Sequence, residues 1–168
     1  MNSVISANTI RFIVLLFTQV IIFNHINFLG YINPYPYILF IILYPAKNNR
    51  IAFLLLSFLL GLTIDLFLDS GGIHAAASVL VAYSRPIFLK SSFGMIYEHQ
   101  TIKFSTVEFG SKLTYIAFLT AVHHLTLFTL EIFSVSKIIL ILQKALFSSI
   151  FTILLCVLLT IIFSRNKT

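Results

Sequence analysis

Residues 51–89 of the chain read IAFLLLSFLLGLTIDLFLDSGGIHAAASVLVAYSRPIFL. Two apolar runs, residues 51–68 and 73–89, are each close in length to the about 20 residues that a helix needs to cross a bilayer. The polar turn Asp69-Ser70-Gly71-Gly72 separates them. Because hydrocarbon offers no partner to an unpaired backbone amide, each run must be helical. The stretch therefore predicts two antiparallel membrane-spanning helices.

The rest of the chain has the same composition. Of its 168 residues, 59% are hydrophobic and 10% are charged, and the mean hydropathy is +1.02. About a quarter of the residues of a soluble domain are charged, so this chain has too little polar material to cover a surface that faces water. The composition excludes a soluble enzyme, a disordered tail and a nucleic-acid binder. It predicts an all-α, polytopic membrane protein with a single integral membrane domain over residues 1–168.

Six apolar segments are predicted to be spans: residues 10–29, 31–46, 51–68, 73–89, 113–133 and 138–163. The second contains an apolar core of only 12 residues, 35–46, with prolines at both ends. It is interpreted either as a short span or as a re-entrant half-helix buried by protein. The longest connection, residues 90–112, is predicted to be a cytoplasmic loop that Pro86 introduces.

The basic residues orient these segments. If six spans are assumed, nine of the 11 Lys and Arg residues lie on the side that holds both termini. Because short cytoplasmic loops are enriched in Lys and Arg, both termini are predicted to be cytoplasmic. Arg85, one turn before the predicted end of its helix, is expected to extend to the lipid headgroups. Interfacial anchoring is expected of four tyrosines: Tyr31, Tyr35, Tyr37 and Tyr44.

Polar side chains inside a span are costly, so each marks a candidate site. Asp65 and Asp69 are four residues apart and are expected to share one helix face. Asp69 or Ser70 is expected to cap the next helix, and Gly71-Gly72 permits a sharp reversal with positive φ. His74 then lies within reach of the carboxylates. Three alternatives remain for this cluster: capping with interhelical pairing, partner binding, and catalysis or ion transport.

A second polar group lies in the fifth segment. His123 and His124 are near its middle, and Glu131 follows two turns later. Adjacent histidines point about 100° apart around a helix, so we expect them to bond to Asp, Ser or backbone carbonyls rather than to one metal ion. Lys144 is the expected partner of Glu131. No cofactor, metal or catalytic residue is predicted, because no known catalytic motif occurs, and the chain is interpreted as not being an enzyme.

Three stretches resemble the rod shape-determining protein MreD family. They are NPYPY at residues 33–37, GLTIDLFLDSGGIHAAA at 61–77 with Arg85-Pro86 beyond it, and HHLTLF at 123–128 followed by Glu131. The spacing Asp-x-x-x-Asp-x-Gly-Gly-x-His-Ala is the most specific part of the resemblance. Length and hydrophobicity agree with the family along the whole chain.

The resemblance implies a non-enzymatic scaffold of the cell-wall elongation complex in the bacterial cytoplasmic (inner) membrane, acting in rod cell shape and lateral peptidoglycan synthesis. Its implied partners are an MreC-like bitopic protein, the wall-synthesis transpeptidase and transglycosylase and, indirectly, the actin-like MreB filament. The resemblance also implies a fold similar to the six-helix substrate-binding subunits of vitamin transporters. That likeness supplies an alternative function, a small-solute binding subunit whose pocket would be lined by Asn24, Asp65, Asp69 and His74.

Overall fold

The computed structural model describes residues 2–30, 32–46, 49–94 and 107–165. The long helices are α1 (Asn2–Ile21), α3 (Arg50–Leu68), α4 (Ile73–Phe93), α6 (Phe109–Ile132) and α7 (Ile138–Arg165). The short elements are α2 (Leu39–Leu43) and three 3₁₀ helices, η1 (Phe23–His25), η2 (Pro36–Ile38) and η3 (Val135–Lys137). Within the described residues, the only β pairing is an isolated bridge between Phe28 and Ile32.

Four stretches of the described chain are long and apolar enough to cross a membrane. They are Ala7–His25, Arg50–Leu68, Phe109–Ile132 and Val135–Ile162. Large apolar side chains cover their outer faces; Leu66, for example, is 76% exposed and Ile139 is 70% exposed. Apolar surface on this scale needs a lipid environment. The chain is therefore a helical membrane protein.

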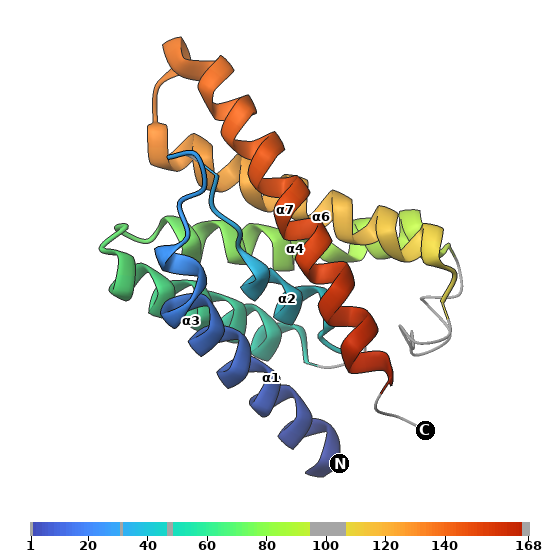
Figure 1. Ribbon diagram of the computed structural model, residues 1–168. Helices are drawn as coiled ribbons and strands as arrows, with labels where there is room; N and C mark the ends of the chain where they lie inside the picture. Colours follow the sequence, from blue (N-terminus) through green and yellow to red (C-terminus); the bar gives the residue numbers. More distant parts are fainter. Residues whose placement is uncertain (1, 31, 47–48, 95–106, 166–168) are drawn as a thin grey trace.

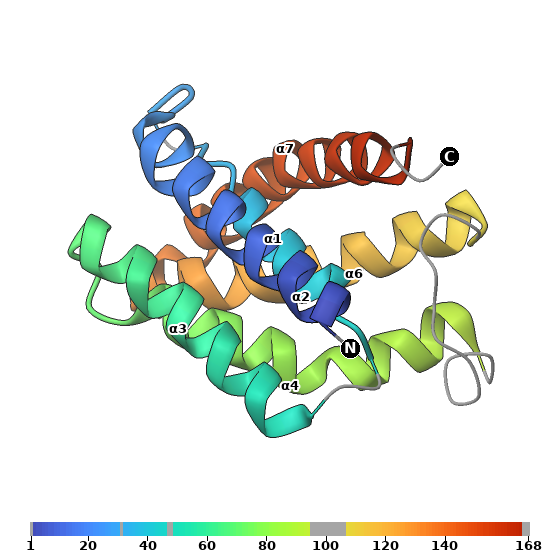
Figure 2. The same cartoon turned by 90° about the horizontal axis from the view of Figure 1, so that it is seen from below.

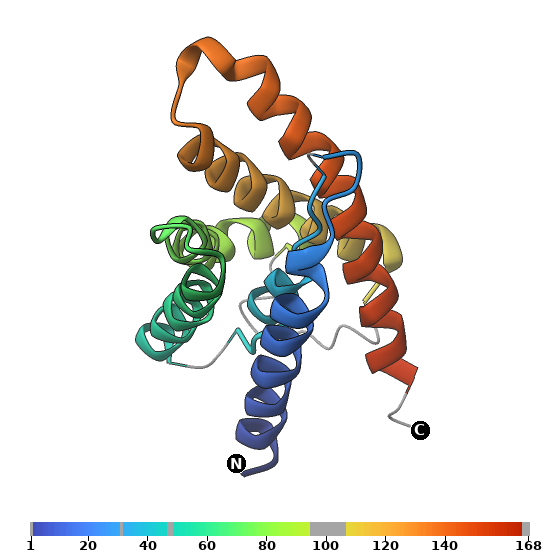
Figure 3. The same cartoon turned by 60° about the vertical axis from the view of Figure 1, so that its left-hand side comes forward.

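The long helices surround one short segment, residues 34–44, which contains η2 and α2 and which we call the central segment. α3 packs against α4, α4 against α6, and α6 against α7, while α1 packs against α3. Between them, η2 and α2 contact α1, α4 and α7, and two views show α2 beside α1 in the interior (Figures 2 and 3). Residues 37–42 are at most 1% exposed. Both termini lie toward the lower edge of Figure 1, and the turn between α6 and α7 lies at its top.

The second predicted span is the segment that differs most from a full-length helix. Its helical part, residues 36–43, is about 12 Å long at 1.5 Å per residue, against a hydrocarbon core of about 30 Å. Tyr44 is extended, with ψ of 138°, because the residue before a proline is disfavoured in a helix. Pro45 therefore ends α2 at Leu43. The segment is a short helix that protein surrounds on every side.

Helix boundaries also correct the prediction. α1 begins and ends earlier than the predicted span at residues 10–29. α4 continues through Pro86 to Phe93, so Pro86 does not introduce a loop and the connection predicted at residues 90–112 is shorter. Residues 95–106 of that connection lie outside the described residues. The spans predicted at 51–68, 113–133 and 138–163 agree with α3, α6 and α7 to within four residues.

Candidate functional site

The carboxylate of Asp65 closes the N-terminus of α4. Its Oδ1 accepts a hydrogen bond from the backbone N–H of His74 at 3.0 Å, and its Oδ2 accepts one from Ala75 at 2.8 Å. The hydroxyl of Ser70 donates to Oδ1 at 2.5 Å, and Nδ1 of His74 lies 3.0 Å from the same oxygen. The predicted proximity of His74 to a carboxylate is confirmed. Asp65 is only 4% exposed, and both of its carboxylate oxygens accept hydrogen bonds from groups inside the fold.

Asp69 does not join this group. It is the C-cap residue of α3, with a left-handed φ of 51°, and its side chain is exposed. The helix has ended, so the prediction that Asp65 and Asp69 share one face is wrong. The prediction that Asp69 or Ser70 caps α4 is also wrong, because Asp65 reaches over the turn to do so. The positive φ predicted for Gly71 and Gly72 is confirmed, at 67° and 94°.

Gly61, about one turn before Asp65, lets α3 approach α4 closely. A Cβ atom at this position would lie 2.5 Å from the carbonyl oxygen of His74 and 2.6 Å from the backbone nitrogen of Ala75. These are the two residues whose amides Asp65 caps. The absence of a side chain at Gly61 therefore brings the carboxylate within hydrogen-bonding distance of α4.

The two histidines of α6 lie in the centre of the molecule and are fully buried. Nε2 of His123 is 2.6 Å from the hydroxyl oxygen of Tyr37. Nδ1 of His124 is 2.9 Å from the carbonyl oxygen of Thr120, and its Nε2 is 3.1 Å from the hydroxyl oxygen of Thr152 on α7. The backbone carbonyl was predicted as a partner, but the tyrosine and the second threonine were not. Among the described residues, no group of His, Cys, Asp and Glu could hold a metal ion.

Two tyrosines of the central segment connect these histidines to the α3–α4 turn. The ring centroid of Tyr35 lies 5.4 Å from that of His74 and 5.5 Å from that of His124. The ring of Tyr37 lies 6.1 Å from His74 and 5.2 Å from His123. Two helices, α4 and α6, and the central segment thus share one buried cluster of five aromatic rings, which we call the aromatic cluster.

The position of these tyrosines corrects a sequence prediction. Tyr35, Tyr37 and Tyr44 are 6%, 0% and 7% exposed, so they are core residues and not interfacial anchors. Tyr31 lies outside the described residues. The NPYPY motif was the available signal, because its prolines restrict the backbone of the segment, whose two tyrosines both contact His74 and His123.

Arg85 is enclosed by protein rather than extended to the headgroups. It is 3% exposed, its Nε donates to the hydroxyl of Tyr115 at 2.7 Å, and its Nη2 donates to the carbonyl oxygens of Ile42, at 3.2 Å, and of Tyr44. Its guanidinium also lies 5.2 Å from the ring centroid of Phe53. The predicted extension is wrong because α4 continues about two turns beyond Arg85. Arg85 instead binds the C-terminal carbonyls of α2, where the helix dipole favours a cation.

Two further predictions have opposite outcomes. The pair of Glu131 and Lys144 is confirmed, because Nζ of Lys144 donates to Oε1 of Glu131 at 2.7 Å near the turn between α6 and α7. Asn24 was expected to line a pocket with the acids of the α3–α4 turn. Its side-chain oxygen instead accepts a hydrogen bond from Gln19 at 3.0 Å.

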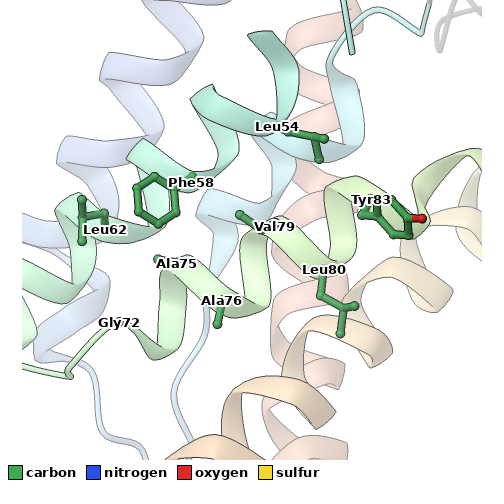
Figure 4. Close-up of a pocket in the computed structure, with 9 residues that line it drawn as sticks. All are labelled: Leu54, Phe58, Leu62, Gly72, Ala75, Ala76, Val79, Leu80 and Tyr83. Atoms are coloured by element: carbon green, nitrogen blue, oxygen red, sulfur yellow. The ribbon is translucent and has the colours of Figure 1, made fainter. Parts of the chain in front are cut away.

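An apolar groove of about 680 Å³ lies on the outer face of α3 and α4 (Figure 4). We call it the α3–α4 groove, and its lining residues are Leu54, Phe58, Leu62, Gly72, Ala75, Ala76, Val79, Leu80 and Tyr83. Figure 4 shows Phe58 and Leu62 on α3 beside Ala75 and Ala76 on α4. No charged side chain lines the groove, and three of its lining residues are small: Gly72, Ala75 and Ala76.

No protein-family model, curated protein or solved structure matches this chain. Fold and site together define a helical membrane protein whose buried polar side chains bind its own helices to one another.

Proposed function

We propose that the chain is a non-enzymatic membrane scaffold of the bacterial cell-wall elongation complex, acting in rod cell shape and lateral peptidoglycan synthesis. The sequence motifs that resemble the MreD family suggest this function. One structural observation supports it most directly: the buried polar groups around Asp65 bind helices to one another, while the adjacent open surface is an apolar groove. A scaffold requires such a body with a docking surface, and it requires no reaction centre.

The proposed topology has six crossings, with both termini in the cytoplasm. The path of the central segment supports it. The side-chain amide of Gln19 donates to the carbonyl oxygen of Pro34, and Arg11 donates to that of Leu43, each at 3.4 Å. Residues 34–43 therefore run antiparallel to α1, which is the direction that the proposed second crossing requires. Nine of the 11 basic residues then lie on the side of the termini, in accord with the positive-inside rule.

The proposed occupant of the α3–α4 groove is the single membrane-spanning helix of an MreC-like bitopic protein. Helices associate in lipid where small residues let their backbones approach, and Ala75 and Ala76 offer such a surface. Through this partner the chain would be linked to the wall-synthesis transpeptidase and transglycosylase and, indirectly, to the MreB filament. The bacterial cytoplasmic membrane is the corresponding location.

No observation favours the alternative of a solute-binding subunit. A solute pocket combines apolar walls with several convergent polar groups. The groove carries only the hydroxyl of Tyr83, and none of the four side chains expected to line a solute pocket reaches it.

Co-purification tests the proposed function. We would express the tagged full-length chain with the MreC-like protein of the same genome, solubilise it in a mild detergent, and quantify the recovered partner. Ala76→Leu fills the groove from an exposed position of α4. We expect it to lower recovery about tenfold, which corresponds to about 1.4 kcal/mol of binding free energy.

The matched control is Ala7→Leu, which makes the same chemical change at an exposed position of α1 and is expected to leave recovery unchanged. Equal recovery from the two variants would contradict the groove as the docking surface. Absence of the partner from wild-type preparations that retain native helicity would contradict the scaffold function itself.

A further inference from the structure

A second cavity lies where α3 begins. It has a volume of about 190 Å³ and is lined by Pro45, Ala46, Arg50, Phe53, Ala82, Arg85, Pro86 and Leu89. Two of these residues are arginines and none is acidic. We call this space the arginine cavity. It is separate from the α3–α4 groove, with which it shares no lining residue.

Arg85 brings a buried positive charge to this cavity. Its described partners are the Tyr115 hydroxyl and the carbonyl oxygens of Ile42 and Tyr44. These groups are dipoles, and none of the four acidic residues that the structure describes forms an ion pair with Arg85. A buried charge is costly unless an opposite charge compensates it. The cavity is the open space beside this guanidinium in which an anion can supply the compensation.

Arg50 adds a second positive charge to the lining of the cavity, at a helix end where the helix dipole does not favour a positive charge. It is the first residue of α3, and the dipole at a helix N-terminus favours an acid over a base. Its guanidinium lies 5.2 Å from the ring centroid of Tyr83 on α4, and its side chain is exposed. The dipole of α3 and both arginines therefore act in the same direction, and all three favour an anion in the cavity.

The volume of the cavity and its depth in the membrane indicate which kind of anion it can bind. At about 30 Å³ for each water in the liquid, 190 Å³ holds about six waters, below the roughly 300 Å³ at which metabolite pockets begin. One phosphate group fits this space, and a whole nucleotide does not. The candidate span Arg50–Leu68 begins at the cavity, which places it at the level where hydrocarbon gives way to lipid headgroups.

We propose that the arginine cavity binds the phosphate of an anionic phospholipid headgroup. The phosphate accepts hydrogen bonds from Arg85 and Arg50, and the acyl chains leave the site along the lipid-facing side of the protein. Arginine is suited to this role because its planar guanidinium presents several donors to one oxyanion. Bound lipid would also stabilise the end of the central segment, since Arg85 contacts the last carbonyls of α2.

Native mass spectrometry of the full-length chain, released from nanodiscs, tests this proposal. The titrated probes are dioleoyl phosphatidylglycerol and dioleoyl phosphatidylcholine, with inorganic phosphate as a competitor. We expect one phosphatidylglycerol to be retained with at least about tenfold higher affinity than phosphatidylcholine. Arg50→Gln is expected to remove most of this preference, and it leaves the folding contacts of Arg85 in place. Lys137→Gln removes one positive charge from an exposed residue of η3 and is expected to change nothing.

Three results would overturn the proposal. Equal retention of the two lipids would exclude an anion-selective lipid site. Equal behaviour of Arg50→Gln and Lys137→Gln would mean that net charge, and not the cavity, selects the lipid. Displacement of phosphatidylglycerol by millimolar inorganic phosphate would assign the cavity to a soluble anion. If Arg50→Gln loses the lipid preference but still co-purifies with an MreC-like partner, the scaffold function does not depend on the lipid site.

Discussion

Two buried charged residues close helix ends in this molecule, and they do so in opposite ways. Asp65 accepts hydrogen bonds from the first amides of α4, and Arg85 donates to the last carbonyls of α2. Each charge has the sign that the adjacent helix dipole favours. The same physical device therefore holds the α3–α4 turn at one end of the interior and the central segment at the other.

The two sites differ in reach and in enclosure. Asp65 binds groups nine and ten residues along the chain, and Ser70 and His74 surround its carboxylate. Arg85 binds carbonyls more than 40 residues away, and the arginine cavity lies beside it. The Asp65 site is local and closed, whereas the Arg85 site is long-range and open. The Asp65 site is suited to stabilising the fold alone. The Arg85 site is suited both to stabilising the fold and to binding a ligand.

Replacing Arg85 should have the largest effect on stability. Arg85→Met keeps much of the side-chain volume but removes three hydrogen bonds from the charged guanidinium, to the Tyr115 hydroxyl and to the carbonyls of Ile42 and Tyr44, at about 1.5 kcal/mol or more for each. The Tyr115 hydroxyl keeps its hydrogen bond to the carbonyl oxygen of Ile42. We expect the free energy of unfolding in mixed detergent micelles to fall by about 4 kcal/mol. Arg85→Lys keeps the charge without the planar donors and should lose about half as much. A loss below about 1 kcal/mol for the methionine variant would contradict a structural role for Arg85.

Removing the Asp65 cap should be the next largest change. Asp65→Ala takes the acceptor from two backbone amides of α4 and from Ser70, so we expect a loss of about 3 kcal/mol in the same unfolding assay. Asp65→Asn retains one oxygen acceptor and should lose about half as much. Asp69→Ala is the matched control, because the Asp69 side chain is exposed and does not accept hydrogen bonds from the α4 amides that Asp65 binds. Equal losses from Asp65→Ala and Asp69→Ala would show that the difference drawn between the two acids is wrong.

Gly61 tests whether the Asp65 cap depends on close helix packing. In Gly61→Ala the new Cβ atom would overlap the backbone of α4 at His74 and Ala75, so α4 must move away from the carboxylate. We expect a loss of about 2 kcal/mol, within the range for overpacked cores. Gly110→Ala is the control, since the nearest atom to a Cβ there is 3.9 Å away. If cooperative unfolding of Gly61→Ala matches that of Gly110→Ala, the close approach is not required.

The ion pair at the α6–α7 turn should matter least. Glu131→Gln removes the charge that Lys144 binds, but the Glu131 side chain is 39% exposed. Ion pairs that water or headgroups can reach contribute about 0.5 kcal/mol, so the midpoint of thermal unfolding should shift only slightly. A shift as large as that of Asp65→Ala would place this pair among the buried supports of the fold.

Which contacts of the two sites could be predicted from the sequence depends on how far apart the contacting residues lie along the chain. The α3–α4 pair, its positive-φ glycines and the approach of His74 to an acid were predictable, because the turn brings nearby residues together. Asp65 rather than Asp69 became the cap because Asp69 is the left-handed C-cap residue of α3 and its side chain is exposed. The predicted end of the apolar run at residue 68 does not by itself show which acid faces α4. The partners of Arg85 come from the central segment and from α6, and no local pattern pairs them. Tyr37 could not be assigned to His123 for the same reason.

Crosslinking in living cells tests the proposed docking surface most directly. A photoreactive residue would be introduced at Leu80, which lines the α3–α4 groove and is 44% exposed, and separately at Leu154 on α7, which is 57% exposed. The scaffold proposal predicts that Leu80 crosslinks to the membrane helix of an MreC-like protein and that Leu154 does not. Crosslinks of equal yield from the two positions, or none from Leu80 while the partner is present, would contradict it.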